Sequence, residues 1–195
     1  MKPKYPWTPL TRLLHALLAL TVIIQVLFIL IRENIDRHGD WGIYRQMLIL
    51  WHKWNGFIVL GLVIAYFVVK GLQHKKQMWL QFYPLTPEAR SKIVQDVCIL
   101  RQGKLPVRST PESLGGLSGL IQGLGLLLVF GLALLGALAM ASWAGLLIPS
   151  SSGTFFIQTH KLLAGLIWWY LGGHTAMALI HWLLPKQFQQ VIAET

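Results

Sequence analysis

Four long apolar stretches dominate the sequence and decide which folds are open to it. They run over residues 10–31, 47–72, 114–147 and 155–184. Each can cross a bilayer as an α-helix, which takes about 20 predominantly apolar residues. With 54% hydrophobic and 12% charged residues, the chain is also far more apolar than an ordinary soluble domain. We therefore expect one all-α integral membrane domain over residues 1–195, an up-down-up-down four-helix bundle.

The net charge of +10 would suit a nucleic-acid partner, but the charges lie beside the apolar stretches. The two chain ends and the long middle loop carry twelve Lys and Arg residues, and the two other loops and span ends carry five. The positive-inside rule then places both termini in the cytoplasm of a bacterial inner-membrane protein. We expect membrane lipid, and no nucleic acid, to meet this charge.

The long middle loop contains one more helical pattern. Thr86 is suited to cap a helix N-terminus, Pro87 to occupy its first position, and Gly103 to end it. Apolar residues recur between them at helical spacing, flanked by Arg and Lys. The pattern predicts a short helix lying in the cytoplasmic membrane surface, with a docking site for a partner subunit as the alternative. The first outer loop is predicted over residues 32–46.

Five of the seven histidines fall inside the apolar stretches, and one of these, His181, lies near the end of the last stretch. His160 and His174 share the last stretch, and their fourteen-residue spacing is close to four whole helical turns, so both rings point to one side. They stand about 21 Å apart along the axis. An ionisable side chain within a span is costly and indicates a functional site. We expect solvated or interfacial roles for three histidines: His38, His74 and His181.

The expected topology sorts the other four histidines into two pairs by depth. His52 and His160 come near the outer ends of the second and fourth spans, whereas His15 and His174 lie on the cytoplasmic side. Two six-coordinate haems need this arrangement, with one imidazole on each face of each iron. One zinc or copper ion cannot join all four, since its ligands lie within about 2.1 Å. For any single histidine, a hydrogen-bonded packing role is the alternative.

Basic residues near these histidines are candidates to pair with haem propionates, which need water or cationic partners. They are Arg12, one turn from His15, and Lys53 and Lys161, each adjacent to an outer histidine. The alternative is that these side chains reach the lipid headgroups. The one cysteine, Cys98, allows neither a disulfide nor an iron–sulfur cluster within the chain, and covalent haem attachment is excluded because C-x-x-C-H does not occur.

Small residues also accompany the helices. Gly115, Gly119 and Gly123 recur every four positions in the third span and share a face. Such a face favours close helix packing, with close approach of a flat ligand as the alternative. Gly56, Gly165, Gly172 and Gly173 lie near the histidines, where a porphyrin needs space.

Three segments resemble the bacterial cytochrome b561 group, which includes the b-type dihaem cytochrome subunits of nickel–iron hydrogenase and formate dehydrogenase. They are TRLLHALLAL around His15, WHKWNG with His52, and THKLLAGLIWWYLGGHTAMALIHW with the last histidine pair. The resemblance implies that all four histidines are axial ligands of two b haems, and that a quinone is the substrate or redox partner. The family often has a tryptophan where this chain has Ala16.

We therefore expect transmembrane electron transfer through two bis-histidine b haems, between a periplasmic redox protein and the membrane quinone pool. An electron-transfer subunit is preferred over a complete enzyme. One alternative is a free-standing superoxide:quinone oxidoreductase, whose outer surface would need to steer a small anion. The outer side carries five basic against three acidic residues, which favours it weakly. A further alternative is a haem-free membrane scaffold.

Overall fold

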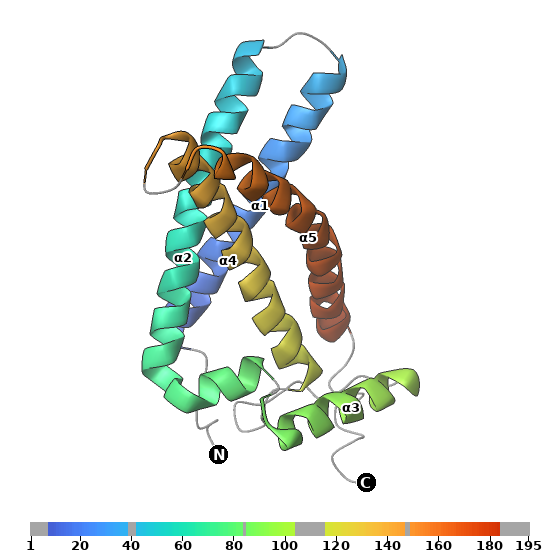
Figure 1. The fold of residues 1–195 in the computed structure, drawn as a ribbon. Helices are drawn as coiled ribbons and strands as arrows, with labels where there is room; N and C mark the ends of the chain where they lie inside the picture. Colours follow the sequence, from blue (N-terminus) through green and yellow to red (C-terminus); the bar gives the residue numbers. More distant parts are fainter. Residues whose placement is uncertain (1–7, 39–41, 84, 104–115, 147–148, 184–195) are drawn as a thin grey trace. The chain divides into compact units, whose positions relative to one another are not determined.

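The computed structural model describes residues 8–38, 42–83, 85–103, 116–146 and 149–183. Over these residues the chain is all-α and contains no strand (Figure 1). The helices are α1 (Pro9–His38), α2 (Gly42–Phe82), α3 (Pro87–Arg101), α4 (Leu117–Trp143) and α5 (Ser152–Leu183). The expected all-α membrane fold is confirmed, because four helices contain segments long and apolar enough to cross a membrane: Pro9–Asp36, Gly42–Leu72, Leu117–Trp143 and Ser152–Ile180.

The chain divides into two compact units, which we describe separately. The first unit comprises the described residues within 8–69 and 128–165, and the second comprises those within 70–127 and 166–195. The first unit therefore holds α1, most of α2, the second half of α4 and the start of α5. The second unit holds α3 and the remaining parts of α2, α4 and α5.

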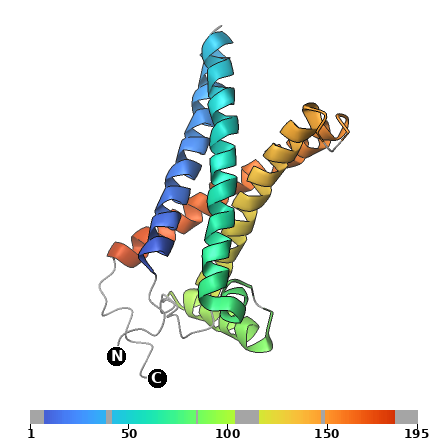
Figure 2. The same cartoon turned by 90° about the vertical axis from the view of Figure 1, so that its left-hand side faces the viewer.

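In the first unit, α1 and α2 run side by side (Figure 2). They are longer than predicted, since α1 continues to His38 and α2 begins at Gly42. The predicted outer loop over residues 32–46 was therefore wrong in extent. Asp36 explains much of the difference, because it pairs with Arg32 one turn earlier on α1 and with Arg45 across on α2, at 3.5 and 3.1 Å. These ion pairs stabilise the helical conformation of the polar residues at the end of α1 and the start of α2.

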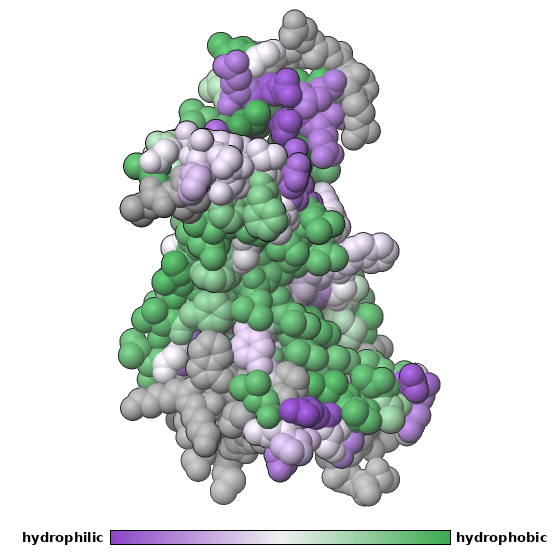
Figure 3. Space-filling model, viewed as in Figure 1, coloured by the Kyte–Doolittle hydropathy of each residue, from purple (hydrophilic) through white to green (hydrophobic). Residues whose placement is uncertain are grey.

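Apolar side chains are spread around the helices of the first unit. Buried apolar side chains of these helices include Val22 of α1, Val63 of α2 and Ala139 of α4. Many other large apolar side chains are exposed, including Leu20 and Leu162. Figure 3 shows this hydrophobic surface along the helices and hydrophilic residues gathered at the joined ends of α1 and α2. A helix that is apolar on all sides is typical of a lipid environment.

The connection after α4 is a tight turn. The amides of Gly145 and Leu146 donate to the carbonyls of Ser142 and Ala141, which is the Schellman pattern of a helix end. Gly145 has a φ of 68°, a left-handed conformation that glycine adopts without strain. The hydroxyl of Ser142 also donates to the carbonyl of Pro149. These bonds fold the chain back toward the start of α5.

In the second unit, α3 forms at the residues where the sequence predicts it. Thr86 is the N-cap, and its hydroxyl accepts from the amide of Ala89 at 3.2 Å. Pro87 is the first helical residue, and Gly103 has a φ of 73° just beyond the end. The predicted start and stop of this helix are confirmed. Asp96 of α3 accepts from the amide of Leu117 at 2.7 Å and so caps the N-terminus of α4.

Glycines of α4 bring neighbouring segments of the second unit close. A Cβ built on Gly123 would lie 2.7 Å from the carbonyl oxygen of Phe82, too close for any side chain. A Cβ built on Gly125 would collide with the ring of Tyr170. The packing interpretation of the glycine face is supported at Gly123, whereas Gly115 lies outside the described residues.

Candidate functional site

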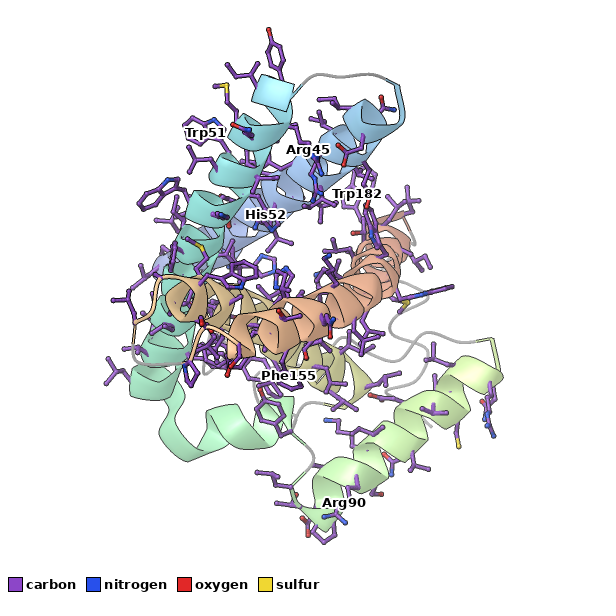
Figure 4. The ribbon with its side chains drawn as sticks, turned by 45° about the horizontal axis from the view of Figure 1, so that its top comes forward. Arg45, Trp51, His52, Arg90, Phe155 and Trp182 are labelled. Atoms are coloured by element: carbon purple, nitrogen blue, oxygen red, sulfur yellow. The ribbon has the colours of Figure 1, made fainter. Side chains whose placement is uncertain are left out.

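Two of the histidines lie next to each other in the first unit. His52, on the third turn of α2, and His160, on the third turn of α5, have ring centroids 6.2 Å apart and ring planes at 86°. Both side chains are partly buried. Figure 4 shows His52 on the side of α2 that faces α1, while the neighbouring Trp51 points away. The two helices therefore bring together two imidazoles that are far apart in the sequence.

One nitrogen of His160 is held by the backbone of α4. Its Nδ1 lies 2.8 Å from the carbonyl oxygen of Leu132. A carbonyl oxygen only accepts hydrogen bonds, so Nδ1 must carry a proton and donate it. In the neutral ring the lone pair is then on Nε2. Metal-binding histidines are oriented in this way, with the second ring nitrogen donating to a backbone carbonyl.

Gly136 of α4 provides space beside the same ring. A Cβ built on this glycine would lie 3.6 Å from Cε1 and Nδ1 of His160, which is an ordinary van der Waals contact. Any larger side chain would extend over the imidazole. The glycine therefore puts no side-chain atom against this side of the His160 ring.

His52 has one buried nitrogen without a partner. Its Nδ1 makes no hydrogen bond within the described part of the chain. The backbone of His52 is held more firmly, because the amide of Gln25 donates to its carbonyl oxygen at 2.9 Å. The amide nitrogen of Asn55 in turn donates to Gln25 and to the carbonyl oxygen of Thr21, at 2.6 and 2.8 Å. Interhelical amide bonds of this kind hold two membrane helices in register.

The other two predicted haem ligands belong to different units. His15 is an exposed residue of α1 in the first unit. His174, in the second unit, stacks on Tyr170 one turn before it, with ring centroids 5.4 Å apart and ring planes at 22°. Sequence reasoning missed Tyr170, although its position four residues before a histidine could have identified it. The pairing of His15 with His174 stays a prediction.

The predicted propionate partners are all exposed side chains: Arg12, Lys53 and Lys161. Two other cations, Arg32 and Arg45, converge on Asp36 between α1 and α2. Sequence reasoning missed them because it placed both in a loop. Within the described residues, no group of three or more His, Cys, Asp or Glu side chains is close enough to hold a metal ion. The site therefore offers paired imidazoles and nearby guanidiniums.

Comparison with known proteins adds one finding. Residues 6–192 match the family model described as prokaryotic cytochrome b561. No curated protein and no solved structure gives a significant match.

Proposed function

We propose that this chain, which belongs to the prokaryotic cytochrome b561 family, transfers electrons between a donor at the periplasmic face of the inner membrane and the quinone pool. Its family and its four spans make it a multi-pass bacterial membrane protein of haem b electron transfer. The proposal adds two haems, held by His52 with His160 and by His15 with His174, and a quinone as redox partner. It also adds cytoplasmic termini, from the distribution of basic residues.

The separation of His52 and His160 is the observation that carries this proposal. An imidazole nitrogen lies ~2 Å from a metal that it binds, and its ring centre lies roughly 1 Å further back. Two axial rings of one iron should therefore stand about 6 Å apart between centres. The observed distance is 6.2 Å. The proton on Nδ1 of His160 adds to the fit, since it leaves Nε2 for the iron.

Positions along the helices support a second, deeper pair. The contact between Gln25 and the carbonyl of His52 marks the depth of the outer site on α1. His15 lies ten residues from Gln25, about 15 Å along the helix axis. His174 lies fourteen residues from His160 on the continuous helix α5, about 21 Å along its axis. On this proposal both residues belong to a second site, well inward of the outer one along their own helices.

The residues of the chain would act by binding and orienting. Haem b, when bound, supplies a one-electron iron centre. His52 and His160 would hold the haem, and two imidazoles on one iron would favour electron transfer over oxygen binding. The carbonyl of Leu132 holds the ring of His160 in one orientation. The lipid-facing apolar side chains would keep water from the site and lower its dielectric.

A reduced-minus-oxidised spectrum and a haem-to-protein ratio test the proposal on purified protein. We expect b-type bands and a ratio of about two, one haem for each pair of axial histidines. A ratio of about one would contradict the second pair, and a colourless, well-folded preparation from haem-replete cells would contradict haem binding altogether.

The outer donor can be sought by affinity capture of the tagged chain from native membranes. A redox protein that copurifies and reduces the bound haem would support a donor subunit. Rapid haem reduction by superoxide without any copurifying protein would favour the free-standing enzyme. Haem oxidation by added quinone tests the other end of the proposed path.

A further inference from the structure

We propose that Arg32 and Arg45 form the binding site for a propionate carboxylate of the outer haem. This inference rests on the proposed function, because it needs a haem held between His52 and His160. The role of propionate partner, predicted from sequence for the lysines adjacent to the histidines, is here assigned to two arginines that lie further along α1 and α2.

Two buried polar atoms that make no hydrogen bond point to a ligand here. Within the described residues, the buried side-chain nitrogens and oxygens without a hydrogen bond are Nε of Arg32 and Nδ1 of His52. Buried polar groups are nearly always hydrogen-bonded, so such atoms indicate a missing ligand or water. One belongs to a guanidinium and the other to an imidazole. A haem carboxylate would supply a hydrogen-bond acceptor for the guanidinium.

The helix register places the arginines above the outer histidine on the same face. Arg45 precedes His52 by seven residues, nearly two full turns, so both lie on one side of α2. Arg32 follows Gln25 by the same interval on α1, and Gln25 contacts His52. Both arginines thus lie about 10 Å outward from the level of His52. Figure 4 shows Arg45 and His52 on the side of α2 that faces α1.

The charged side chains at this position carry an excess of positive charge that an anion could neutralise. Both guanidiniums share one carboxylate, that of Asp36, at 3.5 and 3.1 Å. Each guanidinium has five N–H donors in a planar fork suited to carboxylates. The Nε of Arg32 is the atom nearest Asp36, and at 3.5 Å it makes an ion pair with that carboxylate but no hydrogen bond. Glu33 adjoins Arg32 and therefore points about 100° away around α1.

The lysines considered from sequence are less suited to the role. Lys53 and Lys161 each follow an axial histidine directly, so their side chains point about 100° away from the histidine face of the helix. Both are exposed. The side chain of Arg32 is more enclosed, with 32% of its surface accessible. A desolvated carboxylate is stabilised more by an enclosed guanidinium than by an exposed ammonium.

The test compares four substitutions in haem-loaded protein: Arg32→Gln, Arg45→Gln, Lys53→Gln and Lys161→Gln. Redox titration measures the midpoint potential of each haem. Redox-difference infrared spectroscopy, with haem labelled by ¹³C at the propionate carboxylates, measures carboxylate bands directly. We expect either arginine change to lower the outer-haem potential, because reduction adds negative charge near a propionate that has lost its cation. The labelled bands should shift as well, and neither lysine change should produce these effects.

Asp36→Asn is the opposing variant, because it frees both arginines and removes a negative charge. It should raise the outer-haem potential and shift the same labelled bands. If Arg32→Gln fails to assemble, Asp36→Asn and Arg45→Gln decide the question. The inference is overturned if the labelled propionate bands and the outer-haem potential are unchanged by the arginine and aspartate substitutions. It is also overturned if they change with the lysine substitutions. Neither result would contradict the proposed function, which is contradicted instead if the wild-type protein binds no haem.

Discussion

Nδ1 of His160 donates a hydrogen bond to the carbonyl oxygen of Leu132, and this contact decides which nitrogen of the ring can bind a metal. The bond joins α5 to α4 and sets the direction of the imidazole toward His52, whose ring centre lies 6.2 Å away. A ring held in one tautomer and one orientation loses little entropy when a ligand binds. The backbone of a third helix thus holds His160 in the orientation that its proposed role as a haem ligand requires.

Replacing either outer histidine by alanine should remove one haem and keep the other. His52→Ala and His160→Ala each delete one axial ligand of the same proposed iron, while His15 and His174 lie about 15–21 Å further along their helices. Haem-to-protein ratios and low-temperature spectra of the purified variants provide the measurement. His38→Ala is the control, since this histidine lies at the end of α1. Selective loss of the deeper haem in either variant would refute the assigned pairs.

Gly136→Leu should weaken haem binding at the proposed outer site, whereas Gly136→Ala should leave it intact. A methyl group at this position makes an ordinary contact with His160 at 3.6 Å, but a branched side chain would press on the ring. The loss of one haem, or a change in its spectrum, is the readout. Gly61→Leu is the matched control, because a Cβ there meets nothing within 4 Å. Equal effects at the two glycines would mean that helix composition, rather than contact with His160, is responsible.

Asn55→Leu should destabilise the packing of α1 against α2. Asn55 is buried and donates to Thr21 and Gln25 of α1, and interhelical bonds in membrane proteins contribute about 0.6–2 kcal/mol. Unfolding in graded detergent mixtures measures the loss. Thr21→Val is the control, since the hydroxyl of Thr21 donates to carbonyls of its own helix, those of Leu17 and Leu18, at 2.9 and 3.0 Å. A Thr21→Val effect as large as that of Asn55→Leu would contradict this account.

Stability should decline with alkaline pH in part through Tyr83, which lies beyond the membrane-spanning part of α2. Burial raises the pKa of Tyr83 above its ordinary value of 10.0, because the phenolate loses solvation in the folded state. The folded-state pKa exceeds the unfolded one, so the stabilising contribution is complete below pH 10.0 and is lost as pH rises toward the folded value.

Thermal unfolding of wild type and Tyr83→Phe across this alkaline range gives the measurement. The variant should lose less stability with rising pH than wild type does. At neutral pH it should be slightly less stable than wild type, because it lacks the 3.5 Å hydrogen bond from the Tyr83 hydroxyl to the carbonyl of Gly123. Tyr44→Phe serves as the control, because Tyr44 is exposed at the start of α2. Parallel pH curves for wild type and Tyr83→Phe would exclude this role for Tyr83.

The amino-acid sequence by itself determined the number of spans, the start and stop of α3, and the spacing of histidines along each helix. These features are local, because hydropathy, helix caps and the helical period act within one segment of chain. The tertiary structure decided which side chains meet across helices: His52 with His160, Asn55 with Gln25, and Arg32 with Arg45 around Asp36. Sequence reasoning placed the arginines in a loop, since mixed charges at a span end resemble a turn until a cross-helix ion pair extends both helices. Such meetings depend on the register between helices, which no single segment encodes.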